Sequence, residues 1–158
     1  MTQSLSRQSR WAGEVGYPMA SMTADLARLR DSWRGAQRNR ERDAIFRFLT
    51  NVFDLVAWWA FEKQASERAV RALALKGLAI PRIVEPYAAV IVASVAPERI
   101  DKRSVSKWSR ALRFAAACKS RKKRLRQFIK AQGGINACAT AYNRRLSRRK
   151  RKSEANLG

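Results

Sequence analysis

The side chains in this chain best suited to chemistry are the lysines and arginines of its last third. Residues 102–158 hold 19 Lys and Arg and one acidic residue, Glu154, which gives a formal charge of +18. The other 101 residues hold the remaining 15 basic and 11 acidic residues, so they contribute only +4 of the total +22. Solubility alone is served by interleaved charges of both signs. The sequence therefore predicts a polyanionic partner, and DNA, RNA and an anionic lipid surface all fit.

Groups for catalysis are scarce. The chain has no His, and the basic third has a single acid beyond Asp101, so general acid-base and metal chemistry lack their usual side chains. No glycine-rich phosphate loop of the GxxxxGK[ST] form is present. Cys118 and Cys138 stand twenty residues apart without a ligand motif and are interpreted as core residues or inert thiols. These features predict a non-enzyme with no cofactor, metal or small-molecule substrate.

The stretch FIKAQGGINACATAYNRRLSRRKRK, residues 128–152, contains two apolar patterns separated by two glycines. The first predicts a helix of about two turns that ends at Gly133 and Gly134. In the second, apolar residues recur at steps of four, three and four, so they share one helix face, and Asn136 is positioned to cap that helix. The apolar face consists of Ile135, Ala139, Tyr142 and Leu146.

With that face inward, small residues followed by a row of arginines point outward from the second helix. They are Ala137, Thr140, Ala141, Arg144, Arg148 and Arg151. Small side chains permit close approach to a nucleic-acid groove, Thr140 can hydrogen-bond, and Arg144 can reach guanine acceptors or phosphate. The remaining basic residues of this segment are predicted to hold the phosphate backbone: Arg145, Arg148, Arg149, Lys150, Arg151 and Lys152.

Residues 125–146 resemble generic helix-turn-helix units, in which the second helix enters a groove of DNA. The segment departs from the usual pattern in having Lys130 where a small residue is common and two glycines where one is usual. A plain helical hairpin within a core is the alternative. Further basic residues are predicted to contact phosphates on either side of the inserted helix: Arg103, Lys107, Arg110, Lys122, Lys123, Arg124 and Arg126.

The elements that must position this segment are predicted to be all α-helical, in one compact domain of five or six helices covering residues 22–146. Residues 1–21 show no hydrophobic period and are expected to form a flexible arm. Residues 147–158 are expected to form a flexible basic tail. A helix is expected to begin after Thr23 as N-cap and to run to Trp33 or Arg34.

A long aromatic-rich helix is predicted over 42–76, with apolar residues at alternating steps of four and three. They are Ile45, Leu49, Val52, Val56 and Trp59. This helix, and 45–61 in particular, is either the centre of the core or the seam of a homodimer. Gly77 and Pro81 end it, Pro86 suits the first turn of another helix, and Asp101 is a good N-cap for the helix that opens the basic part, 102–146.

No secretory signal is visible, and the apolar stretch 45–61 is too short and too polar to span a bilayer, so a cytoplasmic or nucleoid location is expected. The leading interpretation is a small DNA-binding regulator or accessory factor. RNA binding is the first alternative, with Trp11 free to stack on bases while Trp108 and Tyr142 belong to apolar stripes. A basic protein that covers an acidic partner is the second alternative, and a role at a membrane surface is a further one.

Overall fold

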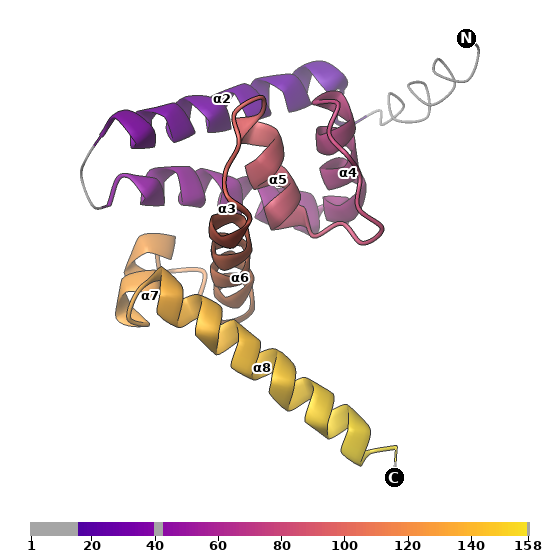
Figure 1. Ribbon diagram of the computed structural model, residues 1–158, viewed down its shortest axis with the longest axis vertical. Coiled ribbons are helices and arrows are strands. Elements are labelled where there is room, and N and C mark those ends of the chain that lie inside the picture. The colour runs from indigo at the N-terminus through magenta and orange to yellow at the C-terminus, as the bar shows by residue number, and fades with distance from the viewer. Residues whose placement is uncertain (1–15, 40–42, 158) are drawn as a thin grey trace. The chain divides into compact units, whose positions relative to one another are not determined.

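The computed structural model describes residues 16–39 and 43–157, and in these ranges every regular element is an α-helix (Figure 1). The all-α class is therefore confirmed for the described residues, although they contain seven helices where five or six are predicted. The helices are α2 (Met19–Arg38), α3 (Ile45–Phe61), α4 (Ala65–Leu75), α5 (Pro86–Val95), α6 (Lys102–Cys118), α7 (Leu125–Ala131) and α8 (Ile135–Ala155). They form two compact units, Met1–Arg99 (unit 1) and Ile100–Gly158 (unit 2).

Helix α2 begins earlier than the sequence predicts. Its first residue is Met19, directly after Pro18, and Thr23 is an internal residue whose hydroxyl donates to the Met19 carbonyl at 2.9 Å. The prediction of Thr23 as N-cap is thus wrong, because the hydroxyl bonds backward along the helix. Of the predicted flexible arm 1–21, residues 1–15 lie outside the described residues, whereas Tyr17 is only 2% exposed and fixed in the core of unit 1.

The predicted long helix over 42–76 is two helices, so that prediction is wrong. Helix α3 ends at Phe61, Lys63 adopts a left-handed conformation with φ 60°, and α4 begins at Ala65. The turn is closed by the Gln64 amide, which donates to the Trp59 carbonyl at 2.9 Å. A left-handed lysine costs about 1–2 kcal/mol. The turn redirects α4 so that Ala69 and Leu73 pack with Ala89 of α5, and this burial offsets the cost.

Tyr17 ties α2, α3 and α4 together. Its hydroxyl donates to Asp25 of α2, and its carbonyl accepts a hydrogen bond from Arg71 Nη2 at 2.8 Å. The guanidinium of Arg68 lies 4.6 Å from the centre of the Tyr17 ring and forms a 2.8 Å ion pair with Glu62. Arg68 and Arg71 are only 2% and 6% exposed. Two of the arginines of unit 1 are therefore structural residues that cannot serve as ligands for a polyanion.

The predicted seam of α3 is the centre of unit 1. Leu49, Val52, Val56 and Trp59 are each 2% exposed or less, and α3 packs on α2, α4 and α5. The core interpretation of this helix is confirmed, and these four side chains are already covered within one chain.

Several local signals in the sequence are confirmed at the ends of these helices. Gly77 has φ 65°, and the amide of Leu78 donates back to the Leu73 carbonyl at 3.0 Å, which closes the end of α4. Pro86 is the first residue of α5, and the carboxylate of Glu85 accepts from the first free amides of that helix. Asp101 caps α6, with its Oδ1 2.9 Å from the Ser104 amide.

Unit 2 consists of α6, α7 and α8 around a small apolar core. Helix α6 packs chiefly on α8, and α7 contacts both. The core residues come from all three helices: Ala111, Leu112 and Ala115; Leu125, Phe128 and Ile129; Cys138, Ala139 and Tyr142. Alanines and a cysteine make up much of the α6 and α8 faces, and small side chains let two helix backbones approach closely.

Each glycine of the α7–α8 turn has its own function. Gly133, with φ 101°, ends α7, and the Gly134 amide donates to the Ile129 carbonyl at 2.9 Å. Gly134 then begins α8 with φ 111° and ψ −179°, and its carbonyl accepts from the Cys138 amide at 3.1 Å. That φ/ψ region is essentially restricted to glycine, so the second glycine is required where a single one is usual.

We expect Gly134→Ala to lower the free energy of unfolding by about 1–3 kcal/mol, because alanine is strained in this backbone conformation. Urea unfolding followed by far-UV circular dichroism measures the change. The matched control is Gly35→Ala, at a helical position of α2 with open space around it, where the free energy of unfolding should rise by about 0.5–1 kcal/mol. A Gly134→Ala protein as stable as the parent would show that the turn does not need this conformation.

We expect Tyr17→Phe to lower the free energy of unfolding by about 1–3 kcal/mol, because it leaves one oxygen of the buried Asp25 without its hydrogen-bond donor. Burial also raises the pKa of Tyr17 above its ordinary 10.0. As the pH rises, the unfolded chain therefore loses the Tyr17 proton before the folded chain does. The stability that Tyr17 contributes is lost as the pH rises through its folded pKa. The Tyr17→Phe variant has no such proton and should not show this pH-dependent loss. Tyr142→Phe is the control, since no described hydrogen bond involves its hydroxyl. Equal urea midpoints for both variants would refute the assigned role of Tyr17.

Candidate nucleic-acid interface

Helix α8 carries the highest concentration of charge in the described residues. Seven of the nine residues from Arg144 to Lys152 are Lys or Arg, and all but the half-buried Arg145 are exposed. The tail predicted to be flexible from residue 147 is helical as far as Ala155, so the prediction of a disordered end is wrong for residues 147–155. Figure 1 shows α8 as one continuous helix, whose backbone distributes these cations around the helix axis.

Contacts with α6 fix the orientation of α8. The guanidinium of Arg113 lies 4.6 Å from the centre of the Tyr142 ring, and Arg145 Nη1 donates to Cys118 Sγ at 2.9 Å. The packed face ends there, because Leu146 is 44% exposed although the sequence predicts it inside. Leu146 is exposed because α6 ends at Cys118, which contacts Arg145, so α6 does not extend along α8 to cover Leu146.

The predicted outward face of α8 is partly correct. Thr140, Arg144, Arg148 and Arg151 are exposed, as the sequence predicts, but Ala137 and Ala141 are half-buried. The backbone of Gly133 approaches Ala137 so closely that a Cβ added to the glycine would stand 3.3 Å from the Ala137 Cβ. The α7–α8 turn thus lies against Ala137, and both alanines are half-buried rather than fully exposed on the outward face.

Asn136 is not the cap of α8. Gly134 is the N-cap, and Asn136 is the second residue of the helix, with no side-chain cap hydrogen bond at this end. The prediction fails because the helix begins two residues earlier than the capping pattern requires. Asn136 is nevertheless exposed, so it remains available to a ligand.

The other predicted contact residues lie on two further segments of unit 2. Arg103, Lys107 and Arg110 recur at steps of four and three and share one face of α6, where Arg110 Nε donates to the Ser106 carbonyl at 3.1 Å. Exposed cations also occupy the connection to α7 and the start of that helix: Lys122, Lys123, Arg124 and Arg126. Lys119 folds over this connection and donates from Nζ to the Lys123 carbonyl at 2.7 Å.

These segments meet at the C-terminal end of α6. Lys119 follows Cys118 directly and binds the basic connection, while Arg145 reaches the Cys118 thiol from α8. Cations near a helix C-terminus are favoured by the partial negative charge of its free carbonyls. The end of α6 therefore brings the basic connection and the middle of α8 into one positively charged region.

Two exposed polar residues of α8 were missed from the sequence. Asn143 and Ser147 lie on the side of the helix left open by α6 and α7. The sequence interpretation left Cys138 out of the buried face of α8, although this residue is fully buried. At about 100° per residue, adding Cys138 to Ala139 and Tyr142 turns the buried face away from Asn143 and so identifies the open side.

The two thiols differ in environment. Burial raises the pKa of Cys138 to about 11, so this thiol stays protonated and acts as a small core residue, as predicted. Cys118 is exposed at the end of α6. In the described ranges, no group of three or more His, Cys, Asp or Glu residues is arranged to hold a metal ion.

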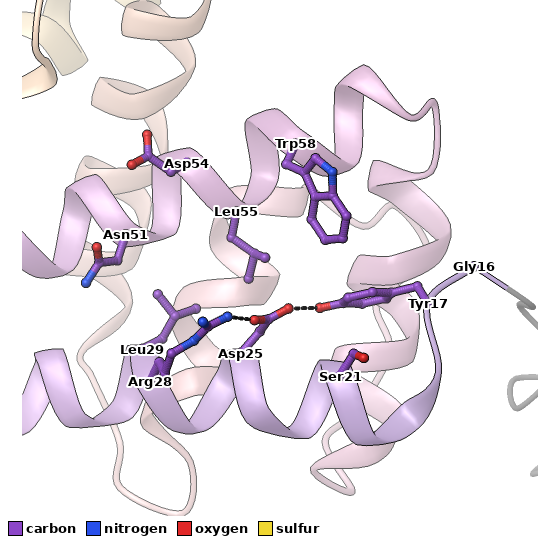
Figure 2. Close-up of a pocket in the computed structure, with 10 residues that line it drawn as sticks. All are labelled: Gly16, Tyr17, Ser21, Asp25, Arg28, Leu29, Asn51, Asp54, Leu55 and Trp58. Carbon is purple, nitrogen blue, oxygen red and sulfur yellow. Dashed lines mark hydrogen bonds and ion pairs between the residues drawn. The ribbon is translucent and has the colours of Figure 1, made fainter.

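A half-open pocket of about 620 Å³ in unit 1 offers a second candidate site (Figure 2). Its most buried acid, Asp25, points between Tyr17 and Arg28, and each carboxylate oxygen is engaged, one by the Tyr17 hydroxyl and the other by the Arg28 guanidinium. Trp58 covers part of the wall, edge-on to Tyr17 at 5.3 Å between ring centres. The polar groups at its centre bind one another, so we assign this arrangement to the stability of unit 1.

None of the described helices combines the length and the apolar character that a membrane span requires. No protein-family model, curated protein or solved structure matches this chain. The candidate site therefore rests on its own geometry and charge.

The crowded charges of α8 predict a salt-dependent helix end. Arg148 has like-charged neighbours three or four residues away at Arg144, Arg145, Arg151 and Lys152, and each such pair costs about 0.2–0.5 kcal/mol. Arg148→Ala should therefore slow amide hydrogen exchange in the last two turns of α8 at low salt, by about four- to thirtyfold if the four pairs contribute together. The gain should shrink as added salt screens the charges.

Ser147→Ala is the matched control for this measurement. It also introduces an alanine, at the adjacent exposed position, but leaves every charge in place. Its effect on amide exchange should therefore be independent of salt. An effect of Arg148→Ala that is the same at low and high salt would exclude charge repulsion as its cause.

Proposed function

We propose that this protein binds duplex DNA through unit 2, as a small regulator or accessory factor, with α8 inserted in the major groove. The observation that supports this most directly is the charge distribution of α8. Its first half presents uncharged, small polar side chains, and its second half presents six exposed cations between Arg144 and Lys152. The first type of surface suits base edges, and the second type suits phosphates.

The dimensions of α8 fit this role. A helix of 21 residues is about 31 Å long, and the major groove of B-form DNA is about 12 Å wide, which admits an α-helix. Only part of α8 is packed on α6 and α7, so the rest of its length is free to lie along a groove.

The order of α7, a glycine turn and α8, with α6 packed on both, supports a helix-turn-helix-like arrangement. The unusual Lys130 does not interfere with helix packing, since it is exposed and α7 uses Leu125, Phe128 and Ile129 for its contacts. The cations of the α6–α7 connection would then hold the sugar-phosphate backbone beside α8.

The aromatic residues of unit 2 favour DNA over single-stranded RNA. Recognition of unpaired bases depends on exposed aromatic rings. Tyr142 is 9% exposed and lies beneath Arg113, and Trp108 is half-buried on α6. Trp11, the ring that the sequence leaves free to stack, lies outside the described residues.

The test is binding of a fluorescent duplex by the full chain over a range of salt concentrations. We expect the logarithm of the binding constant to fall linearly with the logarithm of salt, and Arg151→Gln to make the slope shallower by about 0.9 if this residue neutralises one phosphate. The matched control is Arg82→Gln, an exposed arginine of unit 1, which should leave the slope unchanged.

Competition identifies the class of partner. The same complex is titrated with folded RNA, with anionic phospholipid vesicles and with an acidic polypeptide. Preferential displacement by any of these would favour the corresponding alternative over DNA. Failure to bind duplex in dilute buffer would refute the proposed function.

A further inference from the structure

Four uncharged polar residues form a continuous exposed line along α8. They are Asn136, Thr140, Asn143 and Ser147, at successive steps of four, three and four residues. At about 100° per residue they lie within an arc of about 60° of the helix surface. The covered side of the same turns holds the buried Cys138, Ala139 and Tyr142 and the half-buried Ala137 and Ala141. The polar line is therefore the part of these turns that faces away from the rest of unit 2.

These side chains have no structural task in the described part of the chain. None of the four forms a side-chain hydrogen bond there, and none caps the helix. Asn, Thr and Ser are all poorer helix formers than Ala, Lys or Arg. Four of them in one line within a helix reduce its intrinsic stability, and the open face contains no residue that recovers this cost by packing.

From these observations we propose that the polar line reads base edges in the major groove, with Asn143 specifying adenine; this rests on the proposed function of unit 2. An asparagine amide can donate to adenine N7 and accept from its N6 amino group, a bidentate match that no other base offers in that groove. Asn143 is at the middle of the line, three residues after Thr140 and four before Ser147. Asn136 and Thr140 contact neighbouring bases toward the start of α8.

The position of the arginines supports this assignment. Arg144 lies beside the polar line, about 40° from Thr140, and Arg148 lies about 80° from it, so the arginine row runs along one edge of the line. On the other edge is Lys150, about 20° from Asn143. Cations on both sides of an uncharged line match a groove, in which phosphates flank the base edges. A helix lying on the outside of the backbone would need cations along the contact line itself.

The experiment selects preferred duplexes from a random-sequence pool with the full chain and then compares variants on the selected duplex and on a scrambled one. Asn143→Ala should reduce the preference for the selected duplex by about tenfold or more, mainly at one A·T pair, and leave the salt slope unchanged. Arg148→Gln should weaken binding to both duplexes equally and make the slope shallower. A selected duplex with deaza-adenine, in which a carbon replaces N7, should lose the same preference with the parent protein and lose nothing further with Asn143→Ala.

The outcomes separate the two proposals. Absence of duplex binding would refute the proposed function and this inference with it. Salt-dependent binding without any selected sequence, or a selected sequence whose preference survives Asn143→Ala and deaza-adenine, would overturn the inference alone and leave a sequence-independent DNA-binding protein. Circular dichroism of Asn143→Ala provides the folding control, since alanine at this exposed position favours the helix.

Discussion

The packing of α6 against α8 is the constraint on which the candidate interface depends. Small buried residues on both helices let α6 and α8 pack closely, and one side of α8 stays uncovered. Arg113 over the Tyr142 ring and Arg145 on Cys118 stabilise the same orientation with cationic side chains. An isolated helix with seven cations in nine residues would be weakened by its own repulsion. Packing of its first half is what holds the second half in a helical, oriented form.

Charge alone is an incomplete guide to the ligand-binding surface, and unit 1 shows why. Arg68 and Arg71 count toward the net charge but are buried by Tyr17, and Arg28 is paired with Asp25. A buried guanidinium needs hydrogen-bond acceptors and aromatic faces nearby, and Tyr17 supplies both its carbonyl and its ring. Apart from the half-buried Arg145, the cations of α8 are exposed, so their charge lies at the surface.

Three signals that act within a few residues of sequence predicted helix ends correctly, whereas the predicted caps Thr23 and Asn136 are wrong. Gly77, Pro86 and Asp101 each end or begin a helix as expected, because left-handed glycine, a proline without an amide and a capping carboxylate act locally. The break at Lys63 was missed because nothing local demands it, since lysine rarely adopts positive φ. The turn is stabilised by distant packing, of Ala69 and Leu73 on α5, which no pattern within 42–76 reveals.

The same distinction explains which site residues the sequence identified. The arginines of α8 were found because composition identifies them wherever the helix points. Asn143 and Ser147 were missed because their exposure depends on which face of α8 packs against α6 and α7, and that contact is made between helices rather than within α8. In the proposed function, the charge that attracts a polyanion follows from composition, whereas the face of α8 offered to base edges follows from tertiary packing. We therefore expect a change at the α6–α8 contact to alter the exposed face of α8 without altering a single charge.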